Sequence, residues 1–175
     1  YIPSTDTYIA KETLINEEID RLRHSATRAL FERRDVLIVA SVSCIYGLGS
    51  PEAYYGMLVP LAVGDRCLRQ KFLRRLVEVH YTRTSGDLER GRFRVRGNDI
   101  EVFPAYGQDA LRVVLEDDVI VELASIDPLF GEVEEKFESI SLYPGSHYVT
   151  TSEGRQAAIE TIREELDQHL GVLQE

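Results

Sequence analysis

The chain of 175 residues contains no tryptophan, a single methionine and only two cysteines. No segment approaches the roughly 20 consecutive apolar residues of a membrane-spanning helix, so no membrane partner is expected. No basic segment precedes an apolar stretch at the N-terminus, so the sequence predicts no secretory signal and favours a cytoplasmic location. Cys44 and Cys67 have neither metal-ligand spacing nor the pattern of a secreted disulfide framework. We therefore expect neither a metal site nor a disulfide.

Catalytic signatures are also lacking. The sequence has no Gly-x-x-x-x-Gly-Lys-Ser/Thr motif, with which P-loop enzymes cradle nucleotide phosphates. Gly47 and Gly49 flank one leucine but lack the lysine and third glycine of a phosphate-binding loop. The four histidines lack the spacing of zinc ligands, and no serine stands in a Gly-x-Ser-x-Gly elbow. We predict that the chain is not an enzyme and holds no cofactor; an autonomous small-molecule hydrolase is the less favoured alternative.

The charge balance is acidic. There are 20 Lys and Arg against 30 Asp and Glu, which gives a formal net charge of -10. A surface of this sign repels the phosphate backbone of nucleic acids. Any contact with DNA therefore has to come from a local patch or from another part of a longer protein.

The first third of the chain has the pattern of half an α/β unit. Apolar residues at helical spacing predict an amphipathic helix that packs through one stripe. The stripe consists of Ile15, Ile19, Leu22, Ala26 and Leu30. Residues 36–42 form a continuous, largely β-branched apolar run, which predicts a strand buried on both faces. Ser50, Pro51 and Glu52 then predict a helix start, because serine caps and proline suits the first helical position.

The middle of the chain predicts antiparallel β-structure after a short helix around residues 72–77. Residues 92–96 and 99–103 alternate around Gly97 and Asn98, which predicts a hairpin with a two-residue turn. The expected register pairs Phe93 with Val102 and Val95 with Ile100 on one side, and Arg94 with Glu101 and Arg96 with Asp99 on the other. We expect these charged pairs to be exposed, so that each contributes at most about 1 kcal/mol to folding.

Further elements complete this pattern. Residues 111–115 and 119–123 predict a second hairpin around an acidic turn, and residues 137–142 predict one more strand. Thr150 and Glu153 form a capping box at the start of a long final helix.

Two segments, residues 15–27 and 40–51, resemble the UvrB family of bacterial nucleotide excision repair proteins, and the likeness runs from Tyr1 to the final helix. Because the chain starts within the family's pattern and without a methionine, we expect an internal fragment. The resemblance implies a mixed α/β and α+β fold: part of a P-loop helicase-like domain, a mainly antiparallel β-rich module and a long C-terminal helix. It implies four segments: residues 1–11, the returning strand of a DNA-probing hairpin; 12–55, the partial helicase-like domain; 56–148, the UvrA-binding domain; and 149–175, the C-terminal helix.

The resemblance also assigns site residues. Two tyrosines in an extended segment are usually packing residues, but the family match gives Tyr1 and Tyr8 the role of hairpin aromatics that stack on DNA bases. It gives Arg83, Arg94, Arg96 and, less closely, Arg112 the role of contacts to an acidic surface of UvrA. Val114 stands where relatives tend to carry an acidic residue.

The same resemblance implies what the whole protein does. It would use ATP and magnesium, verify damaged DNA and recruit UvrC, whereas this fragment would contribute UvrA binding. The UvrB-like module of the transcription–repair coupling factor, which also docks UvrA, is the alternative from a different class of protein.

Overall fold

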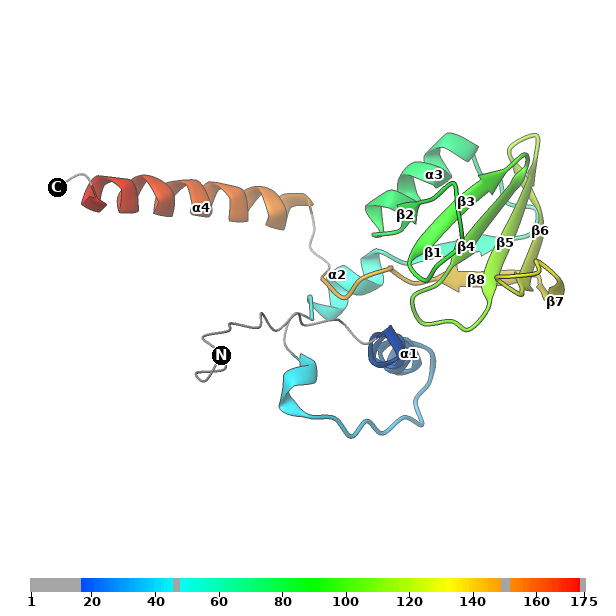
Figure 1. The fold of residues 1–175 in the computed structure, drawn as a ribbon, viewed down its shortest axis with the longest axis horizontal. Coiled ribbons are helices and arrows are strands. Elements are labelled where there is room, and N and C mark those ends of the chain that lie inside the picture. Colours follow the sequence, from blue (N-terminus) through cyan, green and yellow to red (C-terminus); the bar gives the residue numbers. More distant parts are fainter. Residues whose placement is uncertain (1–16, 46–47, 149–151, 174–175) are drawn as a thin grey trace, which may run out of the picture.

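The chain folds, in a computed structural model, into a β-rich body from which one long helix projects (Figure 1). The structure describes residues 17–45, 48–148 and 152–173, so Tyr1, Tyr8 and Thr150 lie outside the described residues. The helices are α1 (Glu17–Glu32), the short 3-10 helix η2 (Val42–Ile45), α2 (Pro51–Gly56), α3 (Arg69–Glu78) and α4 (Ser152–Leu173). The strands are β1 (Val59–Ala62), β2 (Thr82–Arg83), β3 (Arg92–Arg96), β4 (Asp99–Phe103), β5 (Ala110–Glu116), β6 (Val119–Ile126), β7 (Val133–Phe137) and β8 (Ser139–Leu142).

Six strands form one sheet in the order β2-β3-β4-β5-β6-β7, and β1 pairs with β8 in a separate two-stranded ribbon. All neighbours in these sheets are antiparallel except β2 and β3, which run parallel. The prediction of a mainly antiparallel module with a C-terminal helix is confirmed.

Both predicted hairpins form. In the first, the register is the expected one, with Arg94 opposite Glu101 and Arg96 opposite Asp99. Gly97 in its turn has a φ of 58°, a conformation that glycine adopts without steric cost. In the second turn, Asp117 and Asp118 have φ values of 49° and 61°, as a two-residue hairpin turn requires.

The sheet has two unlike faces. On the inner face, α3 lies against the strands (Figure 1), and its Phe72 and Leu76 are buried in the core. Large strand side chains complete this core; they are Phe93, Ile100, Val102, Leu111, Val113 and Leu123. The outer face carries the charged side chains of the first hairpin, because successive side chains of a strand point to opposite faces.

Two predictions for the first third of the chain are wrong. Residues 36–41 form no strand, and Leu37 and Val39 are 90% and 92% exposed. A strand buried on both faces needs neighbouring strands, and none pairs with this run within the described residues. In α1 the predicted stripe is also exposed, since Ile19, Leu22 and Leu30 each keep more than half of their surface in solvent. The helix packs instead through His24 and Phe31, which meet rings from elsewhere in the chain.

The end of the β-region also differs from the expectation. Residues 137–142 hold parts of two strands: β7 joins the large sheet, whereas β8 turns away after Glu138 and pairs with β1. Strand β1 was not predicted, because four residues with a proline give no clear alternation. Helix α4 projects from the body (Figure 1). Its large apolar side chains, Ile159, Ile162, Leu166 and Leu170, are exposed. No helix among the described residues has the length and apolar content to cross a membrane.

Candidate protein interface

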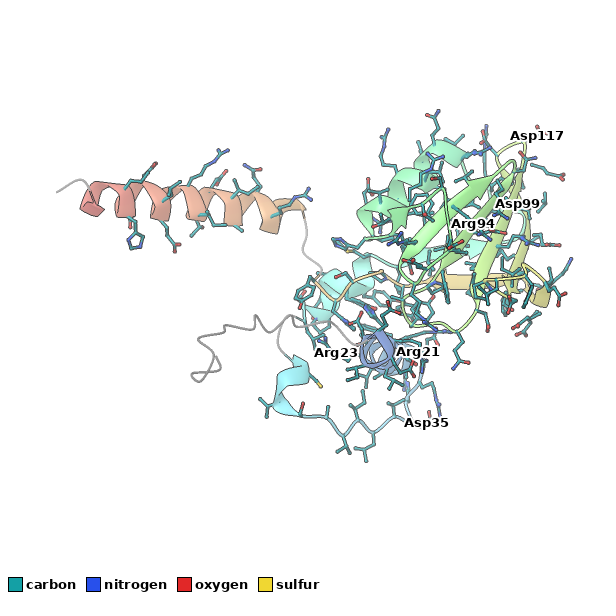
Figure 2. All side chains as sticks on the ribbon, viewed as in Figure 1. Arg21, Arg23, Asp35, Arg94, Asp99 and Asp117 are labelled. Carbon is teal, nitrogen blue, oxygen red and sulfur yellow. The ribbon has the colours of Figure 1, made fainter. Side chains whose placement is uncertain are left out.

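Three of the four predicted arginines gather on the outer face of the sheet. Arg94, Glu101 and Arg112 lie side by side on β3, β4 and β5, in one row of the register. Arg96, Asp99 and Val114 form the next row. Figure 2 shows Arg94 and Asp99 on adjacent strands of this sheet. We refer to Arg94, Arg96 and Arg112 as the arginine face.

A buried carboxylate organises this face. Glu101 is only 3% exposed, and both of its oxygens accept hydrogen bonds from arginines. Arg94 donates through Nε to Oε2, and Arg112 donates through Nη2 to Oε1 at 3.2 Å. One carboxylate therefore holds two guanidinium groups in fixed positions, with charge-assisted bonds that are stronger than neutral ones.

The protonation of Glu101 reflects these contacts. Burial disfavours the charged carboxylate, but the hydrogen bonds from Arg94 and Arg112 outweigh this cost, and the pKa of Glu101 is lowered below its ordinary value. The expectation of an exposed Arg94–Glu101 pair is thus wrong, because β5 brings Arg112 against the other carboxylate oxygen. The β4–β5 register, which the local pattern does not reveal, decides this burial.

The arginines keep donors for a partner. Arg96 is exposed, and among the described residues no hydrogen bond or ion pair engages its guanidinium, although Asp99 lies opposite. Arg94 uses Nε alone, and its terminal nitrogens carry no hydrogen bond to any residue that the structure describes. Arg112 is held by Glu101 and by the carbonyl of Gly131 through Nη2, and its Nε is buried, so it contributes its positive charge to the face more than free donors. Unused guanidinium donors of this kind pair bidentately with carboxylates.

Arg83 lies apart from the arginine face. It is exposed on β2, the two-residue strand at the edge of the sheet. Its register partner is Phe93, whose side chain enters the core on the inner face. Paired residues project from the same face of a sheet, so Arg83 points away from the side that carries Arg94.

The sequence patterns did not predict an apolar cluster that lies beside the arginine face. Leu88, Phe103, Ala110 and Ile126 are buried together on the outer face, where the loop before β3 covers them. The signal was present, because Val102 and Phe103 are consecutive apolar residues at the end of an otherwise alternating strand. This cluster supports Leu88 beside the row of Arg94, Glu101 and Arg112.

A second polar cluster joins α1 to the segment after β8. Donor atoms of Asp20, His24 and His147 lie within 4.8 Å of one another, a distance that suits a metal ion. The two imidazole rings are nevertheless stacked, with centroids 3.8 Å apart and planes 20° from parallel. Nitrogen lone pairs lie in the ring planes, so an ion in the plane of one ring stands well above the other. Thr27 Oγ1 also holds Nε2 of His147 at 2.9 Å, so this geometry suits packing better than ligation.

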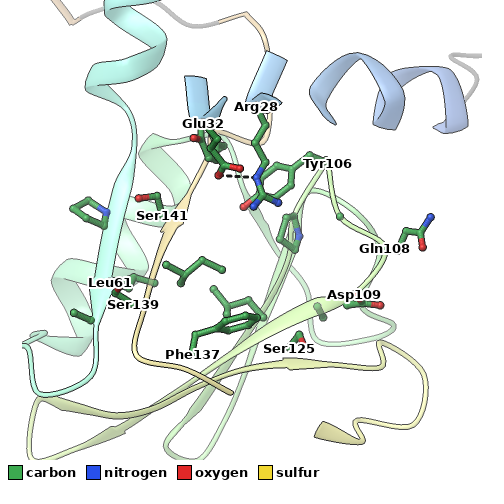
Figure 3. A pocket seen from close by; sticks show the side chains of 18 of the residues that line it. Arg28, Glu32, Leu61, Tyr106, Gln108, Asp109, Ser125, Phe137, Ser139 and Ser141 are labelled. Atoms are coloured by element: carbon green, nitrogen blue, oxygen red, sulfur yellow. Dashed lines mark hydrogen bonds and ion pairs between the residues drawn. The ribbon is translucent and has the colours of Figure 1, made fainter. Parts of the chain in front are cut away.

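A pocket of about 860 Å³ lies between α1, the β1–β8 ribbon and the large sheet (Figure 3). Arg28 of α1 pairs with Glu32 at 2.8 Å and stands 4.8 Å from the ring centre of Tyr106. Serines and the carboxylates of Glu32, Asp65 and Asp109 line the pocket, and its described lining residues include no histidine, lysine or cysteine. The Arg28–Glu32 pair holds the guanidinium, and the contact of Arg28 with Tyr106 ties α1 to the β-region.

Nearly the whole chain is similar to known proteins. A family model described as UvrB interaction domain matches residues 59–148, which contain the whole six-stranded sheet and the arginine face. The UvrABC system protein B of Symbiobacterium thermophilum is 53% identical over 171 residues, 97% of this chain and 26% of that protein. The proteins of the same name from Dehalococcoides mccartyi and Geobacillus kaustophilus are 51% and 52% identical over 174 residues.

The chain spans about a quarter of the length of these relatives. The identity extends well beyond the segment that the family model matches, into α1 and α4, so the transcription–repair coupling factor is not favoured. More than half of the chain thus matches one family model, and nearly all of it aligns with proteins of one name. The chain belongs to the UvrB interaction domain family.

Proposed function

We propose that this chain binds UvrA through the arginine face, as the docking part of a UvrB protein of bacterial nucleotide excision repair. The observation that carries the proposal is the arrangement around Glu101, which fixes the guanidinium groups of Arg94 and Arg112 beside Arg96, whose exposed guanidinium is unpaired among the described residues. Relatives over nearly the whole chain are named for the UvrABC system, which supports UvrA as the partner.

The chemistry of the partner follows from this arrangement. A guanidinium is more weakly hydrated than a lysine ammonium and pairs with carboxylates through a planar fork, so it suits an acidic protein surface. The chain as a whole carries a net charge of -10, and a concentration of arginines on one face therefore orients an acidic partner toward that face. Arg83, at the exposed edge of the sheet, contacts the periphery of the same partner.

The remaining roles belong to the whole protein, of which this chain is a part. The whole protein is cytoplasmic, uses ATP and magnesium, verifies damaged DNA and recruits UvrC. Residues 12–55 derive from its P-loop helicase-like domain, and the exposed run at residues 36–41 is the kind of segment that further strands would cover. Tyr1 and Tyr8 stack on bases of the damaged DNA. No residue of this chain is assigned to ATP, because the sequence has no phosphate-binding loop.

The test is the affinity of the chain for immobilised, purified UvrA. Replacing Arg96 by alanine removes an exposed guanidinium, and we expect it to weaken binding roughly tenfold, with a larger effect for Arg96→Glu. Arg74→Ala is the matched control, because Arg74 is an exposed arginine on α3, behind the opposite face of the sheet. The proposal fails if the parent chain does not bind UvrA, or if Arg96→Glu binds as tightly as the parent.

A further inference from the structure

The turn between β6 and β7, residues 127–132, presents two apolar side chains to solvent. Leu129 and Phe130 are 84% and 80% exposed. Every other phenylalanine that the structure describes is buried or half-buried, so Phe130 is an exception within its own residue type. Single exposed apolar residues are ordinary, but two large ones at the tip of an ordered turn call for a physical reason.

The backbone of this turn is held firmly. Asp127 Oδ1 accepts hydrogen bonds from the amides of Leu129 at 2.8 Å and Phe130 at 2.6 Å. The Gly131 amide donates to the Asp127 carbonyl at 2.8 Å, and the Asp127 amide donates to the Glu132 carbonyl at 2.9 Å. Gly131 has a φ of 73°, which favours glycine. The tip is therefore preorganised. Little conformational entropy of the turn is lost when a partner binds it.

The turn is also attached to the arginine face. Nη2 of Arg112, which donates to Glu101, donates as well to the carbonyl of Gly131 at 3.0 Å. A hollow of about 290 Å³ separates the tip from the guanidinium groups, and both sides line it. Its walls include Arg94, Arg96 and Arg112 on one side and residues 128–131 on the other.

We propose that Leu129 and Phe130 are the apolar anchors of the UvrA interface, inserting into an apolar depression of UvrA while carboxylates at its border enter the hollow and pair with the arginine face. This inference rests on the proposed function. Aromatic residues and arginines are enriched where interfaces derive most of their affinity, and they act best when neighbours exclude water around them. The turn and the arginine face combine both kinds of residue on one preorganised surface.

A second copy of this chain is the less suitable occupant. Strand β7 is the edge of the sheet beside the turn, and its exposed Glu134, Glu135 and Lys136 oppose pairing with another edge. In a symmetric pair of copies the same patch meets itself, so two arginine faces of like charge would be brought together. The observations therefore favour an acidic partner of a different kind.

The test compares Phe130→Ala and Leu129→Ala with the parent chain, using purified UvrA and measuring association and dissociation rates. Both side chains are exposed, so the variants should melt within a few degrees of the parent. We expect Phe130→Ala to weaken binding roughly tenfold or more, mainly through faster dissociation, and Leu129→Ala to weaken it severalfold. Val77→Ala is the matched control, since Val77 is 57% exposed on α3 and lies behind the other face.

Arg96→Ala, measured in the same series, separates the two proposals. If Arg96→Ala weakens binding while both turn variants bind like the parent, the anchors are wrong and UvrA docking stands. If the parent chain does not bind UvrA at all, the proposed function itself fails. If the parent sediments as a dimer and Phe130→Ala is monomeric with unchanged UvrA affinity, the turn serves self-association and the inference is overturned.

Discussion

The imidazole rings of His24 and His147 stack with their centroids 3.8 Å apart, which joins helix α1 to the segment that follows β8. Both side chains are almost completely buried, at 2% and 4% exposure. Burial, together with the neighbouring His147, lowers the pKa of His24 to about 4, and burial also lowers the pKa of His147. Protonation of this pair is thus disfavoured in the folded chain.

The first prediction is a loss of stability at mildly acidic pH. The unfolded chain protonates His24 near its ordinary pKa of 6.5, whereas the folded chain protonates it only near 4. Between these values the unfolded state binds more protons, so the free energy of unfolding falls as the pH is lowered. For His24 alone we expect a loss of about 1 kcal/mol between pH 7.5 and 5.5, measured by urea denaturation at each pH.

Two variants test whether the loss of stability at acidic pH comes from this histidine pair. His24→Phe keeps an aromatic ring in the stack but removes a titrating group, so its stability should depend less on pH than that of the parent. His169→Gln on the exposed helix α4 should retain the full pH dependence. An undiminished acid sensitivity in His24→Phe would show that other groups cause it.

The second prediction concerns Glu101 and folding. Glu101→Ala leaves the guanidinium groups of Arg94 and Arg112 close together without their carboxylate, in surroundings where both are largely covered. Removing one partner from a buried ionic group costs roughly 3–5 kcal/mol, which we expect as a lower urea midpoint. Asp99→Ala, on the same strand but without an ion pair to any described residue, should cost less than about 1 kcal/mol. Equal losses for the two variants would contradict the role of Glu101 as the organiser of this face.

The third prediction separates Arg94 from Arg96, which the hairpin pattern treats as equivalent. Arg94→Ala removes a hydrogen bond to the buried Glu101, so we expect it to destabilise the fold by roughly 1–3 kcal/mol. Arg96→Ala should lie within about 0.5 kcal/mol of the parent, because its side chain is exposed and unpaired among the described residues. Thermal melting compares the stability of both variants. A strongly destabilised Arg96→Ala would show that Arg96 also supports the fold.

The fourth prediction uses two buried tyrosines as a matched pair. Tyr81 Oη donates to the carbonyl of Tyr143 at 2.8 Å, whereas Tyr54 Oη is buried with no hydrogen-bond partner in the described residues. Tyr81→Phe therefore removes a buried hydrogen bond and leaves a carbonyl unsatisfied, at a cost of about 1–3 kcal/mol. Tyr54→Phe removes an unsatisfied hydroxyl and should be neutral or slightly stabilising. Urea midpoints check both, and a Tyr54→Phe variant as unstable as Tyr81→Phe would argue against this reading.

Much of the fold and part of the candidate site follow from local sequence patterns. Alternation and the Gly97–Asn98 turn predict the β3–β4 hairpin with its register, because a two-residue turn fixes which side chains face each other. The two aspartates of the β5–β6 turn and the serine cap of α2 are equally local, with Ser50 Oγ accepting from the Ala53 amide at 3.0 Å.

The tertiary structure decided what depends on pairing between distant elements. The register of β4 with β5 placed Arg112 against Glu101. The Arg94–Glu101 pair, which the hairpin pattern predicts to be exposed, is therefore buried. The attachment of Gly131 to Arg112 joined the apolar tip to the arginine face. Residues 36–41 show the opposite case, since a strand pattern forms a strand only where neighbours satisfy its backbone hydrogen bonds and cover its side chains. Local propensity thus specified the hairpins, whereas long-range register set the burial of each charge and apolar group.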